Sequence, residues 1–201
     1  MEYILIILVS YLIGSIPFSH IFPKLKGKDV TKGGTKNIGA TNALVVAGPV
    51  FGFLSLIGDI GKGALAAYLG QRYIGTPWGL SLAGLASIIG HDFSVFMKFR
   101  GGKGVATTGG VLLIIDPIFA LISLLIWILL MVVTRYFILS TLIIFCAIPF
   151  MMMVVGIRVE YIVFGFLSFL ISIYTHRADV ARIISGREHN IPEALRHYSQ
   201  K

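Results

Sequence analysis

Charged residues are scarce in this chain. They make up 13% of its 201 residues, about half of the roughly 25% found in soluble globular domains. Only nine residues are acidic, against 17 lysines and arginines. The single cysteine, Cys146, excludes an intrachain disulfide and a thiolate cluster. Because hydrophobic residues reach 56% and the mean hydropathy is +0.88, the composition excludes a disordered chain, a coiled coil and an ordinary soluble enzyme. It predicts a polytopic membrane protein.

Apolar runs that can cross a bilayer recur along the chain, and each spanning helix needs about 20 such residues. The first run lacks the basic start and the cleavage site of a signal peptide, so we expect a retained helix. With a short run counted, the sequence predicts an all-α fold of about seven transmembrane helices, some short or re-entrant, in one domain covering residues 1–201. The predicted spans are 3–22, 43–73, 77–97, 105–115, 117–134, 137–156 and 159–175. Residues 38–48 form either the start of the second span or a separate short helix before Pro49.

Basic residues concentrate in three polar stretches, 23–42, 98–104 and 176–201. With seven spans, these stretches and Arg135 fall on one side of the membrane and hold fourteen of the 17 lysines and arginines. Loops rich in lysine and arginine remain in the cytoplasm. The sequence therefore predicts an N-terminus outside and a cytoplasmic C-terminus.

Two of the basic stretches also combine glycines with hydroxyl and amide side chains: Gly33–Asn42 and Gly101–Gly110. Glycines allow backbone N–H groups to converge on an anion, and a following helix adds its positive dipole end. Neither nucleotide-binding pattern, G-x-x-x-x-G-K-[ST] or G-x-G-x-x-G after a strand, is present. Two interpretations remain: basic loops that only set topology, and a cytoplasmic site for a phosphate-rich ligand.

The polar tail begins directly after the last predicted span. It carries His176, Arg177, Arg182, Glu188 and His189. One interpretation is an amphipathic helix on anionic lipid. However, Gly186 and Pro192 interrupt such a helix, and anionic lipid repels Glu188. These features favour the other interpretation, in which the tail forms a second part of the phosphate site.

Asp59 and Lys62 lie three residues apart inside the second span, so one helical face carries both side chains. Ionisable residues in a span are costly and often mark functional paths. A self-neutralising structural pair and a functional path both remain open. His91 and Asp92, near the end of the third span, form either a similar pair or an interfacial one.

In combination and in order, the motifs resemble the bacterial acyl-phosphate:glycerol-3-phosphate acyltransferases, the PlsY family. The resemblance runs from Ile13 to Ile191. The motifs that carry it are Gly14-Ser15-Ile16-Pro17, Asn37–Asn42, Asp59-Ile60-Gly61-Lys62-Gly63, Gly90-His91-Asp92-Phe93, Phe99–Thr107, and His176-Arg177 with Arg182, Gly186 and Glu188. The chain departs from the family pattern at Thr35 and Lys36, at Val45 in place of an arginine, at Ile138 in place of a serine, and at Asp179 and Asn190 in place of an asparagine and a lysine.

The resemblance implies an enzyme of phospholipid synthesis in the bacterial inner membrane, with a cytoplasmic active site. Such an enzyme transfers a fatty acyl group from acyl-phosphate to the 1-hydroxyl of glycerol-3-phosphate, giving lysophosphatidic acid and inorganic phosphate. Membrane lipid is the expected surrounding partner; no metal, cofactor, nucleotide or nucleic acid is implied, and the oligomeric state stays open. The alternative is a small transporter or channel for a phosphorylated anion, which needs polar groups threading the bilayer; Asp59 and Lys62 are its only deep candidates.

Site residues follow from the motifs. The acyl-phosphate is expected to bind Thr35, Lys36, Asn37, Gly39, Thr41, Asn42, Gly101, Gly102, Gly104 and Thr141. Glycerol-3-phosphate is expected to bind Lys103, His176, Arg177, Arg182 and Glu188. Lys103 is expected to bridge both phosphates during catalysis. His176 is the best candidate for a general base on the protein, but we favour proton transfer to the donor's own phosphate. The chain has no H-x-x-x-x-D motif, which characterises the other large class of membrane glycerolipid acyltransferases.

Overall fold

Helices make up all the regular structure of the computed structural model within the residues it describes, which are 1–190, 193 and 197. In chain order they are α1 (Glu2–Ser15), α2 (Phe18–Leu25), α3 (Ala40–Ala47), α4 (Pro49–Ile74), α5 (Pro77–Asp92), the 3-10 turn η1 (Val95–Met97), α6 (Val105–Ile115), α7 (Pro117–Thr134), α8 (Phe137–Val154), α9 (Val159–Thr175) and α10 (Arg177–Ile184). Arg196 and Lys201 of the predicted tail lie outside the described residues. The all-α prediction is confirmed.

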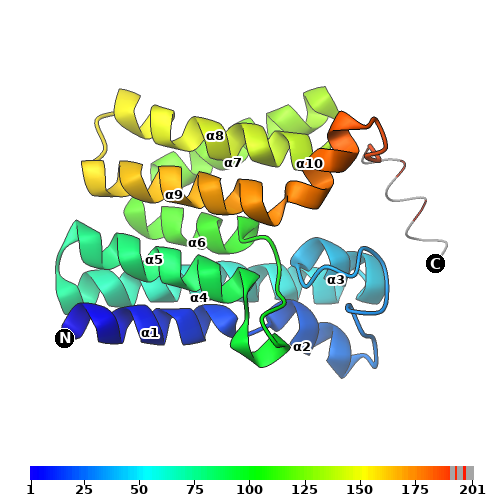
Figure 1. Ribbon diagram of the computed structural model, residues 1–201, viewed down its shortest axis with the longest axis horizontal. Helices are drawn as coiled ribbons and strands as arrows, with labels where there is room; N and C mark the ends of the chain where they lie inside the picture. The colour runs from blue at the N-terminus through cyan, green and yellow to red at the C-terminus, as the bar shows by residue number, and fades with distance from the viewer. Residues whose placement is uncertain (191–192, 194–196, 198–201) are drawn as a thin grey trace.

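Helices long and apolar enough to cross a membrane account for most of the chain. Five qualify within the described part: Glu2–Leu25, Pro49–Ile74, Pro77–Met97, Pro117–Thr134 and Phe137–Val154. A sixth is obtained when α9 is counted together with α10, which is bent from it by 67°, and α6 is a shorter apolar helix. Figure 1 shows α1, α4, α5, α6, α7, α8 and α9 lying side by side along the long axis. This arrangement agrees with the predicted polytopic fold.

The first two predicted spans are broken where proline or glycine interrupts the helix. Span 3–22 is divided into α1 and α2 at Ile16, whose extended backbone (φ −60°, ψ 116°) precedes Pro17. Proline disfavours helical geometry in the residue before it and has no N–H to donate. The second span begins as the separate helix α3, which ends at Gly48 before α4 starts at Pro49. The alternative of a short helix before Pro49 is therefore the correct one.

The polar stretches gather at one end of the helix bundle. Loop 26–39, the loop before α6, and α10 all lie toward the end opposite the N-terminus (Figure 1). Short turns at the other end join α4 to α5 and α8 to α9. Lysines and arginines that are far apart in sequence thereby share one face of the protein, as the charge pattern requires.

Glycines allow two pairs of helices to approach closely. A Cβ atom on Gly14 of α1 would lie 2.1 Å from the Ser87 carbonyl oxygen of α5, and one on Gly90 would lie 2.2 Å from the Tyr11 carbonyl oxygen. Between α4 and α6, a Cβ on Gly63 would lie 2.1 Å from a backbone oxygen of the facing helix. Small residues at such contacts are the usual means of tight helix packing in membranes. Some of the 23 glycines of the chain therefore serve packing within the bundle.

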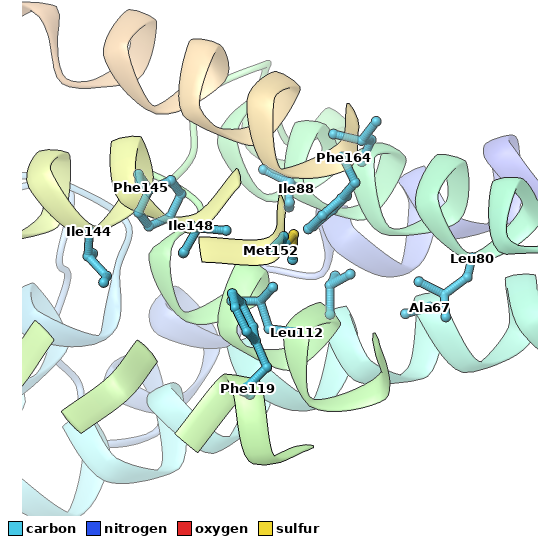
Figure 2. Close-up of a cluster of buried hydrophobic side chains, with 13 residues drawn as sticks. Ala67, Leu80, Ile88, Leu112, Phe119, Ile144, Phe145, Ile148, Met152 and Phe164 are labelled. Atoms are coloured by element: carbon cyan, nitrogen blue, oxygen red, sulfur yellow. The ribbon is translucent and has the colours of Figure 1, made fainter. Parts of the chain in front are cut away.

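The apolar core lies between α4, α5, α6, α8 and α9. Figure 2 shows Ile88, Leu112, Met152 and Phe164 meeting from four of these helices. Phe164 and Met152 are fully buried. The outer side chains of α7, in contrast, are largely exposed, as Ile118 is at 72%. Such exposed aliphatic surface suits a helix that faces lipid.

A charged cluster lies inside this apolar bundle. The Asp59 carboxylate accepts a hydrogen bond from the Ser19 hydroxyl (2.6 Å) and lies 2.9 Å from Lys62 Nζ and 3.4 Å from His91 Nδ1. Lys62 Nζ also donates to the Ile16 carbonyl oxygen (2.9 Å), which lies at the break before Pro17 and also accepts from the Phe18 N–H (3.1 Å). The predicted Asp59–Lys62 pair is thus confirmed, and it ties α4 to α5 and to the break between α1 and α2. His91 joins this pair, whereas Asp92 is buried beside the α6 start.

Removal of one charge from this cluster tests how strongly it holds the bundle. Asp59→Asn leaves the Lys62 ammonium buried without its counter-charge, so we expect a loss of about 3–5 kcal/mol in the free energy of unfolding. The double variant Asp59→Asn with Lys62→Met removes both charges and should recover much of that loss. Reversible unfolding in detergent measures both effects. An Asp59→Asn protein as stable as the wild type would contradict this account.

Candidate active site

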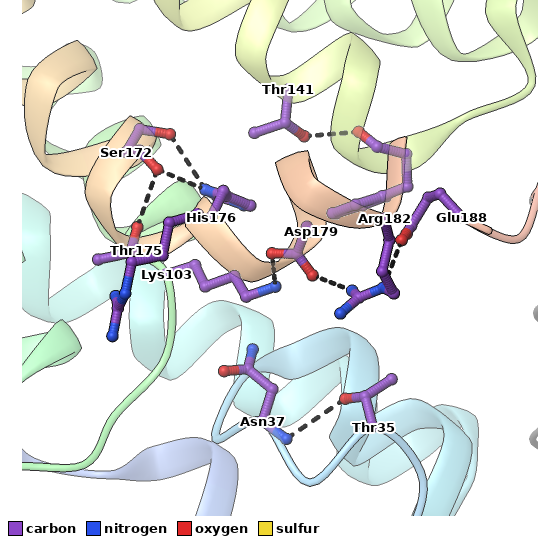
Figure 3. A network of polar contacts seen from close by, with 12 residues as sticks. Thr35, Asn37, Lys103, Thr141, Ser172, Thr175, His176, Asp179, Arg182 and Glu188 are labelled. Atoms are coloured by element: carbon purple, nitrogen blue, oxygen red, sulfur yellow. Dashed lines mark hydrogen bonds and ion pairs between the residues drawn. The ribbon is translucent and has the colours of Figure 1, made fainter. Parts of the chain in front are cut away.

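Four charged side chains from three segments meet at the polar end of the bundle (Figure 3). Lys103 Nζ and Arg182 Nη2 donate to different oxygens of the Asp179 carboxylate. Arg182 Nε donates to Glu188 Oε2 at 2.7 Å. We call Lys103, Asp179, Arg182 and Glu188 the charge network. It joins the loop before α6 to α10 and to the segment after it.

The local sequence explains how α10 presents these charges. Asp179 lies in the first turn of α10, where a carboxylate interacts favourably with the helix dipole. Arg182 follows three residues later, so both side chains share one helical face. Gly186, with φ +65°, then turns the chain so that Glu188 comes back to Arg182. A pocket of about 200 Å³ next to this turn is lined by Tyr136, Leu139, Ile183, Gly186 and Glu188.

His176 lies in the bend between α9 and α10 and is fully buried. Its Nδ1 is 2.9 Å from the Ser172 carbonyl oxygen, a group that only accepts hydrogen bonds. We therefore assign the proton of the neutral ring to Nδ1. Nε2 then carries the lone pair, and it has no hydrogen-bond partner within the described residues. Figure 3 shows His176 next to Lys103 and Asp179.

The buried Asn42 side chain organises the loop that precedes α3. Its Nδ2 donates to the carbonyl oxygens of Val30 (2.9 Å) and Asn37 (2.8 Å), with a longer bond to Gly33 (3.3 Å). Its Oδ1 accepts from the Thr35 backbone N–H at 2.8 Å. Both ends of the amide are therefore engaged by the loop itself.

Asp29 orders the start of the same loop. The backbone N–H and the hydroxyl of Thr31 donate to its Oδ1 at 2.9 and 2.6 Å. These hydrogen bonds, helped by His20 and Lys32, lower the pKa of Asp29 from its ordinary value. The carboxylate therefore stays ionised and keeps the turn in place at neutral pH.

Three predicted ligands of the acyl-phosphate face the charge network from two sides. In Figure 3, Thr35 and Asn37 lie on one side of Lys103 and Asp179, and Thr141 lies on the other. The Thr35 hydroxyl accepts a hydrogen bond from the Asn37 backbone N–H at 3.3 Å. Thr141 is fully buried, and its hydroxyl accepts from Trp127 Nε1 (3.1 Å) and donates to the Phe137 carbonyl (2.8 Å).

The Gly101–Gly104 loop packs directly on the end of α5. A Cβ on Gly101 would lie 2.0 Å from the His91 carbonyl oxygen, and one on Gly102 would lie 2.0 Å from His91 Nε2. The Gly102 N–H donates to that His91 carbonyl at 3.0 Å. Gly104, with φ +70°, then caps α6. This packing places Lys103 beside the first turn of α6, whose free N–H groups attract anions.

The structure thus brings most, but not all, of the predicted site residues together. Arg177 turns away: it stacks on Tyr174, with 4.4 Å between the guanidinium carbon and the ring centroid, and donates to the Tyr174 carbonyl at 2.8 Å. Lys36 and Thr41 are exposed, and Gly39 precedes α3 as its cap. Asp179 had no role assigned from the sequence. The sequence signal for its ion pair with Arg182 is the spacing of three residues, which places both side chains on one helical face.

The chain matches the family model described as glycerol-3-phosphate acyltransferase over residues 4–186. The chain belongs to the glycerol-3-phosphate acyltransferase family. A family relative from Carboxydothermus hydrogenoformans is 40% identical over 189 residues, which cover 94% of this chain and 96% of that protein. A relative from Aquifex aeolicus is 35% identical over 94% of this chain and 99% of that one. The enzyme class expected from the motifs is confirmed.

Two solved structures of family members share the fold. Both are of PlsY, described as an integral membrane glycerol 3-phosphate acyltransferase. The glycerol 3-phosphate form has a TM-score of 0.89 and 34% identity, covering 95% of this chain and 96% of the other. The lysophosphatidic acid form has a TM-score of 0.88 and 33% identity, covering 97% and 99%. The helical arrangement is therefore that of this family along nearly its whole length.

The close contact between Gly101 and α5 predicts the effect of a single methyl group. In Gly101→Ala the new Cβ meets backbone oxygens of His91 and Asp92 at 2.0 and 2.5 Å, so the loop must move and we expect a loss of about 1–3 kcal/mol in unfolding free energy. Gly109→Ala is the matched control, because nothing lies within 4 Å of its Cβ. Unfolding in detergent compares the two. Equal stability of Gly101→Ala and wild type would contradict the proposed packing.

Proposed function

We propose that this protein transfers a fatty acyl group from acyl-phosphate to the 1-hydroxyl of glycerol-3-phosphate, releasing lysophosphatidic acid and inorganic phosphate. The family and the relatives solved with glycerol 3-phosphate and lysophosphatidic acid support this reaction. The observation that carries it is the charge network at the polar end of the bundle, in which Asp179 joins Lys103, on a glycine-rich loop, to Arg182 and Glu188, with His176 beside them. The family match over residues 4–186 supports a single acyltransferase domain.

The reaction needs cations and hydrogen-bond donors more than it needs a protein nucleophile. The acyl-phosphate is a mixed anhydride, so its carbonyl carbon is already activated. The 1-hydroxyl oxygen forms a bond to that carbon, the carbon–oxygen bond to phosphate breaks, and the hydroxyl proton passes to the departing phosphate. Between these events a tetrahedral oxyanion forms, which positively charged and N–H groups stabilise. We assign Lys103 to both phosphates and to this oxyanion.

The donor phosphate is assigned to the two loops that flank Lys103. Its proposed ligands are Thr35, Lys36, Asn37, Gly39, Thr41, Asn42, Gly101, Gly102, Gly104 and Thr141. Within this set, Asn42 acts by shaping the loop, since its amide already holds Val30, Asn37 and Thr35. The N–H groups at the start of α6 supply further donors near Lys103.

The acceptor is assigned to the side of Lys103 that faces α10. Its proposed ligands are Lys103, His176, Arg177, Arg182 and Glu188. Of these, Arg177 has to leave its stacking contact with Tyr174 to reach the charge network. Alignment of both reactants at one lysine removes translational freedom, which contributes up to roughly 7–11 kcal/mol in well-oriented model systems.

We place the site at the cytoplasmic face of the bacterial inner membrane. The gathering of basic loops at one end of the bundle supports this orientation. The acyl chain of the donor then lies among the lipid-facing helices, with membrane lipid as the surrounding partner. A transport function loses its main support, because Asp59 and Lys62 are paired with each other inside the bundle.

The direct test follows phosphate release by the purified protein supplied with palmitoyl-phosphate and glycerol-3-phosphate. We expect release that depends on the acceptor and that is not obtained when acyl-CoA replaces the donor. Lys103→Met should lower this rate by about 10²–10³-fold, the effect of losing one group that stabilises the oxyanion. Lys98→Met is the control, since Lys98 is an exposed lysine of the preceding turn. Near-normal activity of Lys103→Met would refute its role.

The fate of the hydroxyl proton can be tested at His176. If the donor phosphate takes the proton, His176→Gln should raise the KM for glycerol-3-phosphate while kcat falls less than about tenfold, because a general base contributes about 10²–10⁴-fold. Steady-state kinetics with each substrate varied separate the two parameters. A larger fall in kcat with unchanged acceptor binding, together with activity of His176→Ala that is restored by added imidazole, would instead assign the proton to His176.

A further inference from the structure

Asp179 is the residue on which the two cations of the charge network converge. One carboxylate oxygen accepts from Lys103 Nζ and the other from Arg182 Nη2. The Asp179 side chain is only 5% exposed, whereas Lys103 and Arg182 are 22% and 46% exposed. A buried carboxylate therefore bridges two cations whose other surfaces remain accessible.

The charge network is electrically balanced. Lys103 and Arg182 contribute two positive charges, and Asp179 and Glu188 contribute two negative ones. A site that binds a phosphate monoester gains affinity from uncompensated positive charge and from donors in a forked arrangement. Here the forked donors belong to Arg182, and they already bind the carboxylates of Asp179 and Glu188.

We propose that the Asp179 carboxylate competes with the substrate phosphate for Lys103 and Arg182 and thereby sets the affinity of the site for phosphate monoesters. The inference rests on the proposed function, because that function assigns both cations to phosphate. Binding is then an exchange: phosphate oxygens take over donors that Asp179 holds. The same exchange in reverse assists departure of the phosphate-bearing product.

The geometry favours competition over direct recognition of the glycerol hydroxyls. Each oxygen of Asp179 already accepts a charge-assisted hydrogen bond, from Lys103 or from Arg182. A phosphate and the carboxylate cannot both hold the same N–H groups, and two anions at a few ångströms repel each other. Asp179 thus opposes phosphate binding in two ways, by occupying donors and by its charge.

The experiment measures equilibrium binding of radiolabelled glycerol-3-phosphate and of inorganic phosphate to purified protein in detergent, without donor. Asp179→Asn keeps the side-chain shape and removes the charge; Asp179→Ser is the second variant, for the case in which the amide disturbs folding. The control is Glu160→Gln, which changes the net charge equally at the far end of α9. We expect Asp179→Asn to bind both ligands at least about tenfold more tightly, and Glu160→Gln to bind them as the wild type does.

The outcomes separate this inference from the proposed function. Unchanged or weaker binding by both Asp179 variants would overturn the competition, and acyl transfer by the wild type would leave the function standing. Tighter binding of inorganic phosphate by the variants, in a protein that transfers no acyl group, would support the competition and reject the function. A merely structural role for Asp179 predicts weaker binding, so the direction of the change decides.

Discussion

The burial of the Asp59–Lys62 ion pair is the constraint on which the rest of the molecule depends. Charges inside an apolar bundle are tolerated only when counter-charges and hydrogen bonds surround them. Here the Ser19 hydroxyl and the Ile16 carbonyl complete that shell, so the break in the first span supplies hydrogen-bond partners to the buried pair. His91 extends the cluster into α5, and its ring and carbonyl set the position of Gly102, one residue before Lys103. A structural charge cluster thus sets the position of the loop that carries Lys103.

The membrane also explains why the polar residues of the site come from three distant segments. Irregular backbone needs partners for its N–H and C=O groups, and the hydrocarbon core offers none. Loop 26–39 therefore forms at the polar end of the bundle, and the buried amide of Asn42 satisfies part of its backbone. The glycines at 101 and 102 lie against α5 for the same reason, with the Gly102 N–H bonded to a carbonyl left free at the helix end.

The sequence predicted the helical class, most spans and the two loops, because hydropathy and glycine content are local properties. The membership in an acyltransferase family also came from motif order. The sequence did not predict that α1 ends before Pro17 or that His91 joins Asp59, since both features depend on which helices become neighbours. Arg177 and Arg182 look equivalent in the sequence, yet the bend at His176 turns one to Tyr174 and the other to Asp179. The pairing of Lys103 with Asp179 joins residues 76 positions apart, beyond the reach of any local pattern.

The electrostatic design of the site follows from the chemistry that it has to support. In the proposed reaction two phosphates come together at one lysine, and both leave after each turnover, one as inorganic phosphate and one on lysophosphatidic acid. A site with strong unbalanced positive charge would hold the departing phosphates as firmly as the arriving ones. Such binding does not accelerate the chemical step, which gains only from interactions that are stronger in the transition state than in the ground state. On this proposal, carboxylates that neutralise Lys103 and Arg182 weaken the binding of substrate and product phosphates alike, and the developing oxyanion is the species that gains most from Lys103. Balanced charge next to a glycine-rich loop is therefore consistent with turnover rather than with storage of an anion.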